Sequence, residues 1–237
     1  MTDIDIVVPV LNEAHVLEAS IDRLGTYCAH HLPWTWRVVI AENGSRDATP
    51  EIARRLAAAH DNIDVVLLDQ PGRGRALRAA WMRSSARVVG YMDVDLSTAL
   101  DDVPRLFGAI INDGFDIAVG SRRLPDSRVT RSWRRQVISD GYNTLLRAWL
   151  GVRFSDAQTG FKAFRREVAH ALLSQALDQS WFLDTELLVL AERAGYRIAD
   201  LPVTWVEDDD SRVRLVRTAL DDLAGVWRLS RSARRST

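Results

Sequence analysis

The sequence has one cysteine, one lysine and no long apolar run, and each shortage excludes a class of protein. Cys28 has no partner for an intrachain disulfide, so a reducing, cytoplasmic compartment is the expected location. No stretch approaches the roughly 20 apolar residues that a membrane-spanning helix requires. The first residues, MTDIDIVVPV, lack the basic region and long apolar segment of a signal peptide. We therefore expect any action on membranes to come from outside the bilayer.

An excess of one charge sign is also lacking. The 31 basic and 32 acidic residues leave a net charge of -1, which argues against a dedicated nucleic-acid partner. Lys162 is the only lysine, so arginine carries almost all the positive charge, and its guanidinium binds phosphate in a bidentate manner. With 237 residues, 47% of them hydrophobic, the chain can form one large or two small domains.

Apolar runs alternate with helical patterns through the first half of the chain. The runs expected to form strands are Ile4–Val10, Arg37–Ala41, Val65–Asp69, Val88–Met92 and Asp116–Gly120. Strands joined by crossover helices form a mostly parallel sheet, and continuous apolar runs indicate that both faces are covered. The fold class predicted from this pattern is α/β, in one domain.

A last helical pattern, Val213–Leu229, has an apolar face and is followed by a basic end, RSARRST. We expect the α/β domain to span 1–212 and the amphipathic, basic helix and tail to span 213–237. Such a helix can lie on an anionic membrane surface through Trp227 and its arginines. It can equally pack on the body of the protein or on a second subunit of a homodimer, and the sequence leaves these alternatives open.

Two acids, Asp93 and Asp95, directly follow the fourth apolar run. Side chains two apart on a strand point the same way, so both carboxylates should face one side at the end of the sheet where ligands bind. Two such carboxylates repel each other unless a cation lies between them or they ionise unequally, and Mg²⁺ or Mn²⁺ suits oxygen ligands. Solvated or helix-capping acids are the alternative, as is a haloacid-dehalogenase-type phosphatase, although that family places its acids on the first strand.

Eight short motifs occur in a characteristic order along the chain. They are VVPVLNE (7–13), AENGSRDAT (41–49), PGRGRALRAAW (71–81), DVDLST (93–98), GSR (120–122), DAQTGFKAF (156–164), FLDTELL (182–188) and DSRVR (210–214). Together they resemble a family 2 glycosyltransferase of the GT-A fold. More narrowly, the chain is similar to polyprenyl-phosphate and dolichyl-phosphate glucose and mannose synthases.

This resemblance implies an inverting, metal-dependent hexosyltransferase. The donor would be a nucleotide sugar, the acceptor a polyprenyl monophosphate, and the place of action the inner face of the plasma membrane, in cell envelope glycan biosynthesis. Val206 stands where mannose synthases often carry arginine, which favours UDP-glucose as donor. The alternatives are GDP-mannose as donor, a soluble glycan as acceptor, and a catalytically silent binding or scaffolding module.

The resemblance also implies a set of site residues. The donor-binding residues would be Pro9, Leu11, Glu13, Ile40, Glu42, Asn43, Asp93, Val94, Asp95, Gln158 and Arg212. The catalytic residues would be Asp93, Asp95 and Arg122, and the metal ligands Asp93, Asp95 and Ser97. Glu42 and Asn43 replace two aspartates of the family, and Ser97 stands where a glutamine is common.

The stretch from Arg122 to Arg135 contains six arginines and one acid. We predict that Arg122 contacts the donor diphosphate and, with Arg131 and Arg135, the acceptor phosphate; the last two share a face if the segment is helical. Arg73 is a weaker phosphate candidate. A phosphate nucleophile is already anionic and needs no strong base, whereas a sugar hydroxyl would need one, and Asp156 or Asp184 would then be the candidates. A helix N-cap is an equal alternative for Asp184.

Overall fold

The computed structural model describes residues 2–207 and 224–231, without the side chains of residues 134 and 135. Its main sheet has the order β3-β2-β1-β4-β7-β5-β8. The strands are β1 (Ile4–Val10), β2 (Trp36–Asn43), β3 (Ile63–Leu68), β4 (Val88–Met92), β5 (Ile117–Ser121), β7 (Phe161–Arg165) and β8 (Ile198–Pro202). The mostly parallel sheet and all five expected strands are therefore confirmed, with β7 and β8 in addition.

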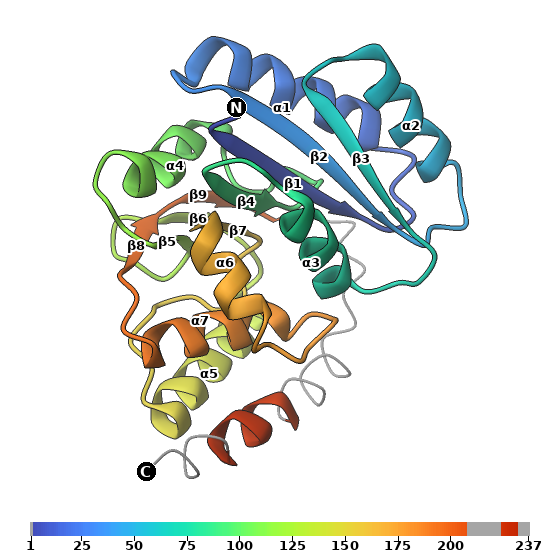
Figure 1. Cartoon of the computed structure of the whole chain (residues 1–237). Helices are drawn as coiled ribbons and strands as arrows, with labels where there is room; N and C mark the ends of the chain where they lie inside the picture. The colour runs from blue at the N-terminus through green and yellow to red at the C-terminus, as the bar shows by residue number, and fades with distance from the viewer. Residues whose placement is uncertain (1, 208–223, 232–237) are drawn as a thin grey trace.

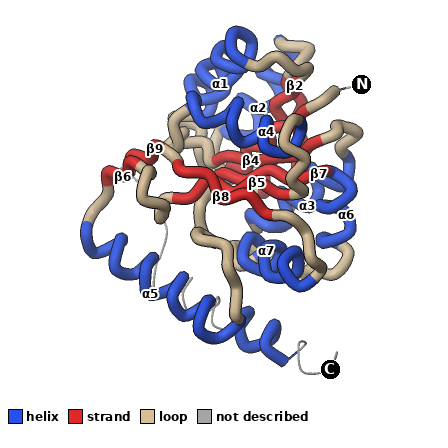
Figure 2. Tube along the Cα trace, turned by 90° about the vertical axis from the view of Figure 1, so that its left-hand side faces the viewer, coloured by secondary structure: helices blue, strands red, loops and turns tan. Residues whose placement is uncertain are grey.

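Helices cover both faces of the sheet, as Figures 1 and 2 show. They are α1 (Leu17–His31), α2 (Thr49–Ala59), α3 (Arg73–Arg83), α4 (Val103–Ile111), α5 (Trp133–Leu150), α6 (Arg166–Leu173) and α7 (Leu183–Arg193). Alternate strand residues divide between two cores: Val8 and Ile40 pack with α1, α2 and α4, and Val7 and Val39 pack with α3, α6 and α7. The alternation explains why the strands are apolar throughout.

The strand order reverses between β1 and β4. The chain runs from β1 through β2 to β3 in one direction, and α3 then returns it to β4 on the other side of β1. In open α/β sheets, ligands bind beyond the carboxyl ends of strands at such a reversal. The residues that follow β4 start at Asp93, so the candidate acids lie at this position.

Strand β7 is antiparallel to both of its neighbours, β4 and β5. Its amino end therefore lies at the same edge of the sheet as the carboxyl ends of β1, β4 and β5. The preceding loop, which contains Asp156 and Gln158, is carried to the acids by this reversal of direction. The linear order of the motifs did not predict that neighbourhood.

A small second sheet pairs β6 (Arg128–Thr130) with β9 (Thr204–Val206). Because α5 begins only at Trp133, Arg131 lies between β6 and the helix. The expectation that Arg131 and Arg135 share one helical face is therefore wrong. Arg135 lies within α5, but its side chain is outside the described residues.

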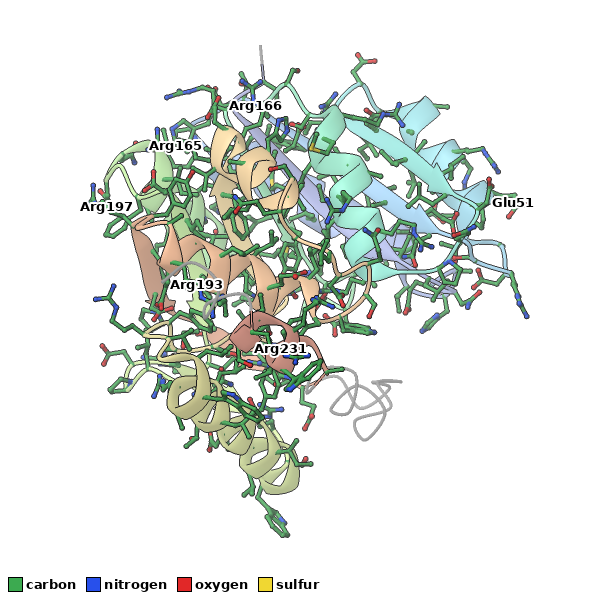
Figure 3. The ribbon with its side chains drawn as sticks, turned by 60° about the horizontal axis from the view of Figure 1, so that its bottom comes forward. Glu51, Arg165, Arg166, Arg193, Arg197 and Arg231 are labelled. Carbon is green, nitrogen blue, oxygen red and sulfur yellow. The ribbon has the colours of Figure 1, made fainter. Side chains whose placement is uncertain are left out.

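The described part of the tail, residues 224–231, is helical and packs on the body. Val226 and Leu229 are buried in the core that includes α7. Arg193, labelled in Figure 3, donates to the carbonyl of Leu229 (3.1 Å), and Arg228 pairs with Glu186 (2.9 Å). Packing on the body therefore applies to this segment. The predicted boundary between 212 and 213 lies outside the described residues and stays a prediction.

Among residues 2–207 and 224–231, no helix has both the length and the apolar character needed to cross a membrane.

Candidate active site

Asp93 and Asp95 lie in a turn that follows β4. The expectation that a strand's pleat aligns them is wrong, because β4 ends at Met92. Leu96 has a positive φ of 51°, and its N–H donates to the carbonyl of Asp93 (3.1 Å), while the N–H of Ser97 donates to Oδ1 of Asp95 (3.0 Å). A left-handed conformation is unfavourable for a leucine and is held by the surrounding structure, as often occurs at functional sites. The turn thus fixes where the two carboxylates project.

Gly160, just before β7, lies directly against Asp93. The N–H of Asp93 donates to the carbonyl of Gly160 (3.2 Å), and a Cβ on Gly160 would lie 1.7 Å from Oδ2 of Asp93. That separation is impossible for non-bonded atoms, so position 160 requires glycine while Asp93 keeps its orientation. The loop before β7 and the turn after β4 are therefore one unit.

Arg73, at the start of α3, connects two carboxylates. Its Nη2 donates to Oδ1 of Asp93 (2.7 Å) and its Nη1 to Oδ2 of Asp184 (2.6 Å). The guanidinium is buried and lies over the rings of Tyr91 and Trp181, at 4.8 and 4.9 Å from their centroids. Burial opposes its charge, but Asp93 and Asp184 raise the pKa of Arg73 well above its ordinary value. The structure therefore pairs Arg73 with acids.

Lys162, the only lysine, is completely buried on β7 beside this group. Its Nζ donates to the hydroxyl of Tyr91 (3.1 Å) and to the carbonyl of Thr159, and lies 4.0 Å from Oδ2 of Asp184. The hydroxyl of Tyr91 in turn donates to Oδ1 of Asp184 (2.7 Å). Burial lowers the pKa of Lys162 and raises that of Tyr91 well above its usual range. Because α7 begins at Leu183, the N-cap alternative for Asp184 is wrong.

Asp156 and Arg122 form a second buried ion pair at the same edge. Nε of Arg122 lies 2.7 Å from Oδ2 of Asp156, and Nη2 lies 3.0 Å from Oδ1. The N–H groups of Arg122 and Gln158 also donate to this carboxylate. Burial would raise the pKa of Asp156, but Arg122 holds it down at about 2. A carboxylate that is fully buried, ionised and paired is poorly suited to act as a general base.

Trp205, on β9, lies between two guanidinium groups. The Cζ atoms of Arg122 and Arg131 are each 5.4 Å from the centroid of its ring. The segment with Trp205 also hydrogen-bonds to the acid turn, since the N–H of Val206 donates to the carbonyl of Ser97 (2.9 Å). Two cations and two acids are thus held on adjoining strands, within reach of one bound polyanion.

The loops after β1 and β2 are tied together on the other side of the turn. The N–H of Asn12 donates to Oγ of Ser45 (2.9 Å), and Oε1 of Glu42 accepts from the N–H of Ser45 (2.5 Å). Asn43 is buried and bridges two loops: its Nδ2 donates to the carbonyl of Val10, and its Oδ1 accepts from the N–H of Gly72. These contacts give Asn43 a structural role and leave a shaped edge beside Leu11.

The other candidates differ in accessibility. Leu11, Asp95 and Gln158 are exposed, Pro9 and Glu13 are half-buried, and Val94 is buried. Ile40 is fully buried in the core with α1 and α2, where its side chain is shielded from a ligand. Arg212 lies outside the described residues. The role of each of these residues in binding stays a prediction.

The donor set around the turn fits a divalent metal held partly by its substrate. No group of three or more His, Cys, Asp or Glu side chains suited to a metal occurs in the described part of the chain. The turn instead offers the carboxylates of Asp93 and Asp95 and the hydroxyl of Ser97, whose Oγ is buried without a hydrogen-bond partner. Mg²⁺ and Mn²⁺ are commonly bound by one or two carboxylates together with phosphate oxygens and water.

Sequence reasoning missed Tyr91, Lys162 and Trp205. The available signal for Lys162 was its rarity, since one lysine among 31 basic residues stands inside the apolar stretch FKAF. Nothing in the sequence indicates that Trp205 is adjacent to Arg122 and Arg131, because β6 and β9 are 73 residues apart at Thr130 and Val203–Thr204 and meet only in the fold. Glu186, expected near the sugar, instead accepts from the N–H groups of Leu177 and Asp178.

Comparison with known families identifies the class of protein. The model of the glycosyl transferase family 2 matches residues 5–173, so the chain belongs to this family. Solved structures of glucosyl-3-phosphoglycerate synthase from Mycobacterium tuberculosis share the fold. One, in complex with UDP, has a TM-score of 0.69 at 21% identity and covers 95% of this chain and 80% of that chain. The fold is therefore the GT-A fold, as the resemblance implied.

Curated relatives narrow the comparison. The chain is 40% identical over 220 residues to glycosyltransferase AglD of Haloferax volcanii, covering 92% of this chain but only 35% of that protein. It is 31% identical to dolichyl-phosphate beta-glucosyltransferase ALG5A of Trichomonas vaginalis (95% and 76% covered). It is also 31% identical to polyprenol monophosphomannose synthase of Mycolicibacterium smegmatis (85% and 77% covered). The chain thus spans about a third of AglD and about three quarters of the other two.

The Asp156–Arg122 pair predicts a specific loss of stability in acid. Because the pKa of Asp156 is about 2 in the folded protein and 3.8 ordinarily, its ionised form stabilises the fold at neutral pH. That contribution, up to about 2 kcal/mol, should disappear as pH falls from about 4 towards 2. Urea unfolding across this range should show a steeper decline for the wild type than for Asp156→Asn. Equal slopes would contradict the assignment, and Asp126→Asn, at an exposed acid, should keep the wild-type slope.

Replacing Gly160 with alanine should displace Asp93. The added Cβ overlaps Oδ2 of Asp93, and a displacement of about 1 Å at a reacting centre can cost about 100-fold in rate. We expect kcat/KM for glycosyl transfer to fall by about that factor. Gly141→Ala is the matched control, because nothing lies within 4 Å of its added Cβ, and it should keep full activity. Unchanged activity in Gly160→Ala would show that the orientation of Asp93 is not required.

Proposed function

We propose that the protein transfers a hexose, with inversion, from a nucleotide sugar to a polyprenyl monophosphate, and that UDP-glucose is the preferred donor. The family supports the glycosyl transfer. The relatives named dolichyl-phosphate beta-glucosyltransferase and polyprenol monophosphomannose synthase support a prenyl phosphate acceptor. GDP-mannose as donor and a soluble glycan as acceptor are the alternatives that the experiments below separate.

One arrangement carries the proposal: the acid turn and the Arg122–Trp205–Arg131 stack occupy adjoining strands. The acids suit the metal-bound diphosphate of a donor. The two guanidinium groups suit a second phosphate, which an acceptor phosphomonoester provides. A sugar hydroxyl acceptor would not need paired arginines, and it would need an accessible base. Asp156 is occupied by Arg122 and Asp184 by Arg73, so neither is well placed for that task.

In the proposed reaction, an oxygen of the acceptor phosphate attacks the anomeric carbon from the side opposite the nucleotide. The C–O bond to the nucleoside diphosphate breaks as the new C–O bond forms, and the diphosphate leaves with the bonding electrons. The phosphate oxygen is already anionic, so no proton has to be removed. Arg131 and Arg122 orient the nucleophile, and Asp93 is held in position by Arg73 and Gly160. The protein therefore acts mainly through positioning and charge compensation.

A divalent ion bound at Asp93, Asp95 and Ser97 would supply Lewis-acid neutralisation of the departing diphosphate. The buried charges around the site are otherwise balanced. Arg73, Lys162 and Arg122 match Asp93, Asp184 and Asp156, which leaves Asp95 as the additional acid of the turn. Mg²⁺ or Mn²⁺ is the cofactor that we propose for this position, consistent with the Mn²⁺ and UDP in related solved structures.

The donor and the metal are tested together by thermal unfolding with UDP-glucose or GDP-mannose, with and without Mn²⁺. A ligand at about 100 times its Kd stabilises a protein by about 2.7 kcal/mol, which is about 5–10 °C in Tm for a chain of this size. We expect that shift with UDP-glucose and Mn²⁺ together, and its loss in Asp95→Asn. Asp101→Asn, at a nearby exposed acid, should keep it. A shift with GDP-mannose alone would overturn the choice of donor.

The acceptor is tested by kinetics of radiolabelled transfer into a chloroform-soluble product. Arg131→Ala removes one face of the Trp205 stack and should raise the KM for the prenyl phosphate about tenfold or more, because hydrogen bonds to charged groups contribute about 1.5–3 kcal/mol. The KM for the donor should change less than about twofold. Arg128→Ala, three residues earlier and exposed, is the control. Equal changes in both KM values would contradict an acceptor role.

A further inference from the structure

Helix α5 has its polar side towards the protein and its apolar side outwards. Asn143 is buried and accepts from the N–H of Ala157 (3.0 Å), Tyr142 bonds to Thr185 (3.0 Å), and Asp140 pairs with Arg123. These contacts support the loop of Asp156 and the start of α7. The body thus uses the polar residues of α5, which reverses the ordinary pattern of a surface helix.

The outward face of α5 is apolar along its whole length. The exposed fractions are 72% for Trp133, 61% for Val137, 49% for Ile138 and 51% for Trp149. The other exposed positions of this face are Gly141, Thr144, Arg147 and Ala148. An 18-residue helix is about 27 Å long, so this is an extended apolar surface with a tryptophan at each end. Contiguous apolar surfaces of this kind mark sites of contact with another molecule or a membrane.

We propose that this outward face of α5 lies on the surface of the lipid bilayer that contains the acceptor. The inference rests on the proposed function and deepens it, because it places the bilayer relative to the phosphate site. A helix with tryptophans and other apolar side chains on one side and polar groups on the other lies in the interface of a bilayer.

The position of the face favours a bilayer over a second copy of the chain. Arg131 lies two residues before the start of α5, so the apolar surface begins beside the guanidinium groups on Trp205. An acceptor with an anionic head and a long apolar chain requires this adjacency, since its chain stays in the bilayer while its phosphate reacts. A second copy on the same face would cover the approach to Arg131.

The tail helix is a weaker candidate for this contact. Val226 and Leu229, its buried apolar residues, pack against α7. Trp227 is exposed, with Arg231 over its ring at 4.3 Å (Figure 3 labels Arg231), but it is one isolated side chain. In Figures 1 and 2, α5 runs along the bottom of the molecule, farther from the sheet than α7. It is therefore the element that offers a continuous apolar face to a flat surface.

The test is vesicle flotation of the full chain without sugar or acceptor, using phosphatidylcholine vesicles that contain phosphatidylglycerol. Because no reaction is needed, failure of the proposed function leaves this readout intact. The double variant Val137→Asp with Ile138→Asp should lower the partition coefficient about tenfold or more, since it removes two apolar contacts and adds charge. Met82→Asp, at an exposed apolar residue on α3, and Trp227→Ser, on the tail, should bind as the wild type does.

Three outcomes would overturn the proposal: no binding by the wild type, equal binding by the wild type and the double variant, or loss of binding only in Trp227→Ser. Light scattering adds a fourth, in which the double variant changes a dimer to a monomer without changing flotation, as a second copy on this face would require.

A labelling experiment covers the case in which the double variant does not fold. Cys28 is fully buried, and burial raises the pKa of its thiol to about 12, so a cysteine introduced at the surface is the reactive one. An environment-sensitive fluorophore on Val137→Cys should shift to the blue with vesicles, and the same label on Met82→Cys should not. Identical spectra at both positions would contradict contact through α5.

Discussion

The site depends on one buried guanidinium. Arg73 joins Asp93, in the turn after β4, to Asp184, in α7, and stacks on Tyr91. An unpaired charge at this depth would be strongly unfavourable, and so would either carboxylate without it. The pairing therefore fixes three elements that are remote in sequence, and it sets the orientation of Asp93. What a ligand meets at this edge is the remainder: the exposed acid Asp95 and the free side of the turn.

The antiparallel strand β7 makes this arrangement possible. A parallel strand between β4 and β5 would place its preceding loop at the opposite edge of the sheet. The reversal brings Gly160 against Asp93, Lys162 beside Tyr91, and Asp156 beside Arg122. Three cations and three anions are then buried close together without a net excess. Such a balanced cluster provides fixed dipoles around a reacting centre, and this preorganisation is where electrostatic catalysis originates.

The second half of the chain converts this edge into a place where two phosphates meet. Strands β6 and β9 place Trp205 between Arg122 and Arg131, next to the acid turn. Helix α5 follows directly, with its polar side supporting the loop of Asp156 and its apolar side outwards. The chemistry at the sheet edge and the apolar surface of α5 are thus joined through two residues of chain, which relates the phosphate site to a lipid surface by covalent connection alone.

The sequence by itself determined the sheet and the position of the acids. Continuous apolar runs separated by helical patterns specify buried parallel strands, and the acids after Met92 had to lie at the carboxyl edge of the sheet. Local patterns could not show which cation meets which acid, because partners such as Arg73 and Asp184 are 111 residues apart. They also could not show that β7 is antiparallel, or that the polar side of α5 faces inwards, since periodicity reveals two faces without saying which is buried. The tertiary structure decided both, because only there do charges and apolar surfaces find their partners.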